Sequence, residues 1–97
     1  MHSVISTHVL DTAGGSPARG VRVELFRDDE LVAERETDDD GRVRDLAAVE
    51  AGTYRLVFHP PSPFFRRIEV EVAIEDGRDY HVPLLLSPYQ CTIYRGS

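Results

Sequence analysis

Lysine and tryptophan are absent from this sequence, and cysteine occurs once among its 97 residues. Without lysine the chain has no amine side chain that could form a Schiff base or attack a substrate as a nucleophile. The single cysteine, Cys91, excludes an internal disulfide framework and a zinc site built from cysteines. Because Cys91 falls within a predicted strand, we expect it to be a packed thiol rather than a nucleophile.

A long apolar run and an excess of positive charge are also missing. No stretch reaches the roughly 20 apolar residues of a membrane-spanning helix, and the residues after Met1 are too few and too polar for a signal peptide. The formal net charge of -6 argues against nucleic acid and anionic membrane surfaces as partners. We therefore predict an acidic protein of the cytoplasm, with room for one domain over residues 1–97.

Short runs of alternating apolar residues recur along the chain, and no segment has a convincing apolar period of 3.6 residues. Turn residues separate these runs, which are rich in β-branched and aromatic side chains. The predicted strands are residues 4–11, 21–25, 31–37, 42–46, 54–59, 68–74, 80–86 and 89–94. Eight short strands with turns between them predict an all-β fold, an antiparallel β-sandwich.

Local signals predict how some of these strands are joined. The acidic run 36–40 ends at Gly41, which can take a positive φ, so Arg42 begins the next strand. Asp76-Gly77 is a two-residue hairpin signal and predicts that the strands on either side of it pair. Residues 47–51 are compatible with one helical turn, too short to be stable alone.

Few side chains suit catalysis. His8 and His81 lie within predicted strands, and neutral imidazole is the best general base near pH 7. Arg42 offers a planar fork for a carbonyl group or a urate-like anion. The strand-like run that continues to Ser97 predicts a fixed place for the terminal carboxylate. Together these groups suit the addition of water to a cyclic amide. Taken singly, each is more often a solvated side chain. Their spacing in the sequence does not by itself show that they lie close together.

Metal binding is the competing use of His8 and His81. The chain lacks the short-spaced ligand pairs of a zinc motif. The run 36–40 resembles a calcium loop in part, but the closing bidentate position falls on Ala47, so the match fails. We therefore predict no metal site. His59, at the end of a strand, is predicted to be a surface residue.

Both ends of the chain resemble the signatures of the transthyretin family. The amino-terminal resemblance rests on His8-Val9-Leu10-Asp11, Gly15, Pro17-Ala18, Val21 and Val23. The carboxy-terminal one rests on the run from Tyr80 to Tyr89, YHVPLLLSPY. The last four residues, Tyr94-Arg95-Gly96-Ser97, resemble the tail of the enzyme branch of the family, the 5-hydroxyisourate hydrolases. The resemblance spans nearly the whole chain, and the two end motifs together are highly specific.

This resemblance implies an eight-stranded, prealbumin-like sandwich with one short helix, assembled as a homotetramer, a dimer of dimers, with active sites in the channel between dimers. It implies hydrolysis of 5-hydroxyisourate to 2-oxo-4-hydroxy-4-carboxy-5-ureidoimidazoline in urate degradation, without metal or organic cofactor. By motif position, His8, Arg42 and His81 match the catalytic residues of the family. His8 and Arg42, with Tyr94 and Ser97 of the tail, match the residues at the substrate.

The chain departs from the family pattern in two places. Residues 60–63, with three prolines, replace the usual helix and loop, so we expect the helix to be shortened or absent. Gln90-Cys91-Thr92-Ile93 replaces the more typical Gly-Tyr-Ser-Thr stretch before the tail. Both changes bear on packing and assembly, and neither removes a residue matched to the chemistry.

Two other functions remain open at this point. Residues 52–58 resemble the strand entry of carboxypeptidase regulatory-like domains, which share the prealbumin-like architecture and act as non-catalytic binding modules. A carrier of a small aromatic ligand in the same channel is the second alternative. Such a carrier has no need for His8 and His81 together, so the effect of replacing both histidines distinguishes it from an enzyme.

Overall fold

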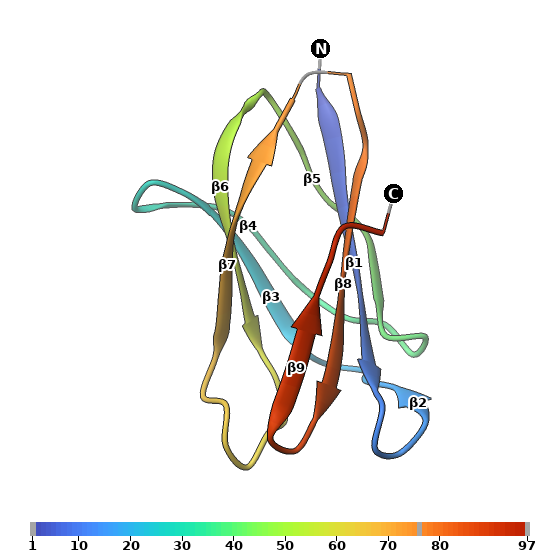
Figure 1. The fold of residues 1–97 in the computed structure, drawn as a ribbon. Coiled ribbons are helices and arrows are strands. Elements are labelled where there is room, and N and C mark those ends of the chain that lie inside the picture. The colour runs from blue at the N-terminus through green and yellow to red at the C-terminus, as the bar shows by residue number, and fades with distance from the viewer. Residues whose placement is uncertain (1, 76, 97) are drawn as a thin grey trace.

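The structure, a computed structural model, describes residues 2–75 and 77–96. These residues form nine strands and no helix, arranged as two sheets around one core (Figure 1). The predicted all-β sandwich is confirmed. The loop at residues 60–67 contains no helix, as the replacement of the family's usual helix and loop by residues 60–63 predicts. Within the described residues, then, no helix is long and apolar enough to cross a membrane.

The first sheet carries both chain ends and has the strand order β2-β1-β8-β9, with β5 also paired to β1. Its strands are β1 (Ser3–Asp11), β2 (Ser16–Pro17), β5 (Arg42–Val49), β8 (Tyr80–Ser87) and β9 (Gln90–Ile93). The second sheet has the order β4-β3-β6-β7. Its strands are β3 (Arg22–Arg27), β4 (Glu30–Glu36), β6 (Gly52–His59) and β7 (Ile68–Ile74).

The central pair of the first sheet, β1 and β8, runs parallel, whereas the other strand pairs of the described residues are antiparallel. Parallel neighbours cannot be joined by a tight hairpin. β1 and β8 are accordingly far apart in the sequence, and they lie side by side in the first sheet (Figure 1).

Two local predictions are wrong. The hairpin predicted at Asp76-Gly77 does not form, because β7 and β8 belong to different sheets and the chain crosses between them there; Asp76 itself lies outside the described residues. The second error concerns residues 47–51, where β5 continues to Val49 instead of entering a helical turn. Pairing of this segment with β1, across a bulge, outweighs its weak helical tendency.

The alternation of buried and outward side chains along β1, and along β8 except at the buried Pro83, decides which side chains are available for function. β1 turns Ile5, Thr7 and Val9 into the core, where all three are fully buried. The buried side chains of β8 that alternate with its outward ones include Val82, Leu84 and Leu86. Each large apolar side chain buried in this way contributes roughly 1.5–3 kcal/mol, which holds the register. Because alternate residues point to opposite faces, His8 and His81 both lie on the outer face of the first sheet.

Candidate active site

The register of the first sheet brings His8, Arg42 and His81 onto one outer face. Arg42 on β5 is the cross-strand partner of His8 on β1. On the other side of β1, Ser6 is the partner of His81 on β8. Since Ser6 and His8 are two residues apart on one strand, they point the same way. The three residues predicted for the chemistry are therefore neighbours on adjacent strands.

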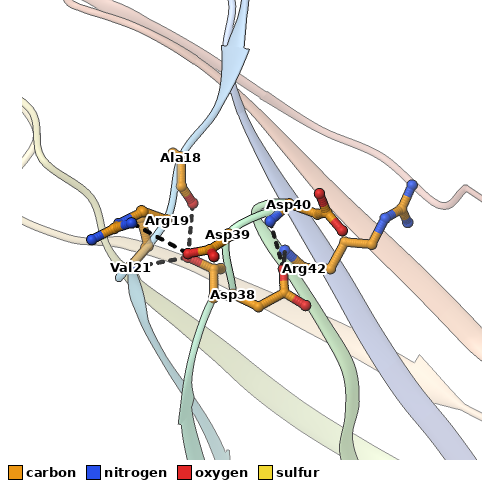
Figure 2. Close-up of polar contacts among 8 residues, drawn as sticks. Ala18, Arg19, Val21, Asp38, Asp39, Asp40 and Arg42 are labelled. Carbon is orange, nitrogen blue, oxygen red and sulfur yellow. Dashed lines mark hydrogen bonds and ion pairs between the residues drawn. The ribbon is translucent and has the colours of Figure 1, made fainter.

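Arg42 is held at the start of β5 by the carboxylate of Asp38 (Figure 2). Asp38 Oδ1 accepts hydrogen bonds from the backbone N–H groups of Asp40 at 2.9 Å and Arg42 at 3.0 Å. The N–H of Asp38 in turn donates to the carbonyl of Arg42 at 2.9 Å. The hydrogen bond from the Arg42 backbone is the main cause that lowers the pKa of Asp38 below its ordinary value. The charged form of Asp38 is thus the form that closes the turn.

Gly41 is required in this turn for two reasons. Its φ is +75°, a left-handed conformation that residues with a Cβ rarely adopt. A Cβ at this position would lie 2.5 Å from the carbonyl oxygen of Val9. The close approach allows the carbonyl of Gly41 to accept a hydrogen bond from the N–H of Val9 at 2.7 Å. The turn is therefore seated directly on β1.

Thr37 anchors the other end of the turn to the body of the sandwich. Its side chain is buried, and its Oγ1 donates to the carbonyl of Ala18 at 2.7 Å while accepting from the N–H of Val21 at 2.9 Å. The neighbouring ion pair between Arg19 and Asp39, at 3.3 Å, is exposed and contributes little. The buried hydroxyl, rather than this surface pair, fixes the turn from which Arg42 emerges.

The same turn orients His8. Its Nε2 atom lies 2.8 Å from the carbonyl oxygen of Asp40. A carbonyl only accepts, so Nε2 carries the hydrogen and donates it. Neutral His8 therefore keeps its lone pair on Nδ1, where it can take up a proton.

His81 is contacted from two sides. Its Nδ1 atom lies 2.9 Å from the hydroxyl of Ser6. On the other side the N–H of Gly96 donates to the carbonyl of His81 at 2.6 Å, and a Cβ at Gly96 would lie 2.8 Å from Cδ2 of the imidazole. Burial is the main cause that lowers the pKa of His81 below its ordinary value, and the charges of Arg42 and His8 lower it further. His81 is accordingly neutral at pH 7, as a general base must be.

A hollow of about 170 Å³ opens beside these residues on the outer face. Its lining residues are Ser6, Thr7, Arg42, Arg44 and His81. Ser6 and Arg44 are absent from the residues predicted for the site. The alternation of side chains along β1 and β5 is the signal that could have found them, since it places Ser6 beside His8 and Arg44 beside Arg42 on the outer face. The hollow presents two guanidinium groups and a neutral imidazole to a bound molecule.

Of the two tail residues predicted for the site, the structure describes Tyr94, which does not line this hollow. Tyr94 lines a different cavity of about 280 Å³ at the open edge between the two sheets, together with Val70 and Val72 of β7. Beside it, the guanidinium of Arg95 lies 4.9 Å from the centre of the Tyr80 ring. Ser97 lies outside the described residues. The structure of one chain thus gathers His8, Arg42 and His81, but not Tyr94.

The remaining candidate side chains lie away from the hollow. Cys91 packs against the core, as predicted. His59 is half-buried rather than freely exposed, and its Nε2 atom hydrogen-bonds the carboxylate of Glu24 on the outer face of the second sheet. Among residues 2–75 and 77–96, no group of three or more His, Cys, Asp and Glu side chains is placed to hold a metal ion.

Comparison with known proteins gives one consistent result. The sequence model of the HIUase/transthyretin family matches residues 5–96. A probable 5-hydroxyisourate hydrolase of Schizosaccharomyces pombe is 38% identical over 112 aligned residues, which cover 96% of this chain and 90% of the relative. The solved 5-hydroxyisourate hydrolase of Klebsiella pneumoniae has a TM-score of 0.88 and 34% identity, covering 98% of this chain and 99% of its own. A sea bream transthyretin in complex with thyroxine has a TM-score of 0.83 and 28% identity, covering 94% and 92%.

Proposed function

Because this chain belongs to the HIUase/transthyretin family, we propose that it is a hydrolase that converts 5-hydroxyisourate to 2-oxo-4-hydroxy-4-carboxy-5-ureidoimidazoline. The observation that carries the proposal is the grouping of His8, Arg42 and His81 on one face of the first sheet. Relatives named as 5-hydroxyisourate hydrolases match over nearly the full chain and support it. Two imidazoles beside a guanidinium suit hydrolysis, whereas a ligand carrier needs no proton acceptor.

In the proposed reaction, water adds to the amide carbonyl carbon of the substrate and the ring C–N bond breaks. One imidazole of the His8–His81 pair takes a proton from the water, and the pair returns a proton to the departing nitrogen. His81 suits this role because its lowered pKa keeps it neutral, and His8 because its Nδ1 lone pair is free. General acid–base catalysis of this kind typically accelerates a reaction about a hundred- to ten-thousand-fold.

Arg42 is proposed to hold the substrate and to stabilise the negative charge that develops on the carbonyl oxygen. A guanidinium can bind two oxygen atoms at once with its planar fork of N–H donors. The backbone N–H and the backbone carbonyl of Arg42 are both hydrogen-bonded to Asp38, which holds this end of β5 in place. A donor that is already in place when the charge develops is the kind that lowers the barrier most effectively.

We further propose a homotetramer, a dimer of dimers, in which Tyr94 and Ser97 of the tails contact the substrate in the channel between dimers. The hollow is open on the outer face of the sheet, so another copy is needed to enclose it. The edge strands β7 and β9 leave backbone groups available for pairing between copies.

A single domain over residues 1–97 is supported by the one core cluster. A cytoplasmic setting is supported by the unpaired Cys91.

The test measures the loss of 5-hydroxyisourate, generated in place from urate by an oxidase, with and without purified protein. We expect the wild type to remove it much faster than its spontaneous decay. His8→Ala and His81→Ala should each lose most of the turnover, since each removes one imidazole of the pair. His2→Ala is the matched control, because His2 is exposed and precedes β1. The proposal fails if the wild-type protein does not remove 5-hydroxyisourate faster than its spontaneous decay. Binding of a thyroxine-like ligand that survives loss of both histidines would then favour a carrier.

A further inference from the structure

The imidazole of His81 is held at both edges of its ring, and the two contacts differ in kind. At the Nδ1 edge, the hydroxyl of Ser6 lies at 2.9 Å. At the Cδ2 edge the ring faces Gly96, where a Cβ would lie only 2.8 Å away. Nδ1 and Cδ2 are the two atoms that exchange places when the ring turns over about its bond to Cβ. After such a turn, Ser6 would face Cδ2 and Gly96 would face Nδ1.

Only one of the two ring orientations satisfies Ser6. In the observed orientation the hydroxyl has a ring nitrogen to bond, and Nε2 is the nitrogen left without a protein partner among the described residues. In the reversed orientation Cδ2, a carbon, would face the hydroxyl, and Cε1 would take the place of Nε2. The torsion about this bond has a broad, two-fold preference of its own, so it does not choose between the orientations. The hydrogen bond to Ser6 favours the observed orientation over the reversed one.

A hydroxyl suits this contact better than a fixed donor or a fixed acceptor. A serine hydroxyl both donates and accepts. It can accept from Nδ1–H, which leaves the lone pair on Nε2, and it keeps the same bond when Nε2 takes up a proton and the ring becomes positively charged. The bond therefore survives the proton transfer that the proposed function requires of His81.

We propose that Ser6 is a positioning residue that holds His81 with Nε2 as its proton-exchanging nitrogen. This inference rests on the proposed function for its effect on turnover, but the orientation of the ring can be observed without substrate. The charged and titratable groups that share the outer face with His81 include His8 on β1 and Arg42 and Arg44 on β5. None of them contacts Nδ1, so none substitutes for the hydroxyl.

The kinetic test compares Ser6→Ala, Ser6→Thr and Ser87→Ala. Ser6→Ala should lower kcat about tenfold or more, a part of the hundred- to ten-thousand-fold that general acid–base catalysis contributes. KM should change little, because Arg42 still binds the substrate. Ser6→Thr keeps a hydroxyl and should recover most of the turnover. Ser87→Ala removes a hydroxyl from the same face of the sheet at the far end of β8, where its Oγ bonds the carbonyl of Gln90, and should leave kcat unchanged.

The second test observes the imidazole nitrogens of His81 by ¹⁵N NMR in the free protein. In the wild type and Ser6→Thr, we expect Nδ1 to show one hydrogen-bonded state through the titration of the ring. In Ser6→Ala, that state should be replaced by a mixture of tautomers. An unchanged kcat together with unchanged ¹⁵N shifts in Ser6→Ala would overturn the inference. If the wild type is inactive while the shifts change as expected, the proposed function fails and the positioning of His81 by Ser6 stands.

Discussion

The Nε2 atom of His8 on β1 lies 2.8 Å from the carbonyl oxygen of Asp40, in the turn that leads into β5. One turn thus orients an imidazole by its backbone carbonyl and fixes the backbone of Arg42 by the carboxylate of Asp38. Two of the residues proposed to act on the substrate depend on this five-residue segment, whose ends are Asp38 and Arg42. Changes in the turn should therefore affect activity even where they do not touch the substrate.

Gly41→Ala should destabilise the protein and lower its activity. A residue with a Cβ at positive φ costs about 1–3 kcal/mol, and here the Cβ would also lie 2.5 Å from the carbonyl oxygen of Val9. The matched control is Gly15→Ala, since Gly15 has a φ of +69° but open space around the added Cβ. The free energy of unfolding, measured with urea, should fall for both variants and further for Gly41→Ala. Equal losses in the two variants would show that the contact with Val9 is unimportant.

Asp38 should make the stability of the turn depend on pH. Hydrogen bonding from the Arg42 backbone lowers the pKa of Asp38 in the folded chain below its ordinary value of about 3.9. The folded state therefore favours the charged carboxylate, and this stabilisation is present above the unfolded pKa and lost as the pH falls through the folded pKa. Asp38→Ala should be less stable than wild type at pH 7, with the difference shrinking in acid.

The comparison for this prediction is Asp39→Ala, which removes a neighbouring exposed carboxylate whose ion pair with Arg19 contributes little. Urea unfolding of both variants and the wild type over a series of pH values measures the effect. A difference between Asp38→Ala and wild type that stays constant into acid would mean that the carboxylate does not close the turn.

The pKa of His81 should be lower than about 6.5, the ordinary value for histidine, and should rise when Arg42 loses its charge. Burial is the first cause of the lowering, and the charge of Arg42 is the second. Arg42→Gln removes the second cause only, so His81 should move part of the way back. Titration of the His81 ring followed by NMR measures this directly and does not depend on turnover. Arg19→Gln removes a distant charge and should leave the titration unchanged.

Arg44→Gln should raise KM and leave kcat nearly unchanged. Arg44 lines the hollow beside Arg42, and its own ion pair with Asp40, at 4.0 Å, is largely exposed and weak. Its charge is therefore available to attract an anionic substrate. Loss of one partly screened contact of about 1 kcal/mol predicts a KM roughly three- to tenfold higher. The difference from wild type should shrink as salt is added; an effect on kcat that salt does not alter would place Arg44 in a different role.

The outward position of His8 could be predicted because it depends on a local pattern: Ile5, Thr7 and Val9 form the buried face of β1, and His8 lies on the other face. The face of His81 could not be assigned in the same way, because β8 is apolar without a break from Val82 to Leu86. The contact between His81 and Ser6 could not be predicted in this way, because it depends on the register of β8 against β1, two strands from opposite ends of the chain. The wrong hairpin at Asp76-Gly77 has the same origin: the turn signal is local, whereas the choice of sheet for β8 is decided by its distant partner.

The place of Tyr94 leads to a prediction about the assembly. In a single chain Tyr94 lines the cavity between the sheets and not the hollow that contains His81. If the tail of a neighbouring subunit supplies Tyr94 to the hollow, His81→Ala and Tyr94→Ala subunits should complement each other. After the two inactive variants are unfolded together and refolded as an equal mixture, half of the sites contain His81 and half of those face an intact Tyr94. About one quarter of wild-type activity should therefore return in a symmetric assembly.

The control is to refold each variant alone, which should restore nothing. Sedimentation of the mixture should show the same oligomer as the wild type, so that a failure of complementation cannot be ascribed to a failure of assembly. Mixed oligomers of the right size with no recovered activity would mean that Tyr94 and His81 serve the same site from the same chain. In that case Tyr94 would have to leave the cavity between the sheets and join Gly96, which already packs against His81 of its own chain, and the cross-subunit arrangement would be wrong.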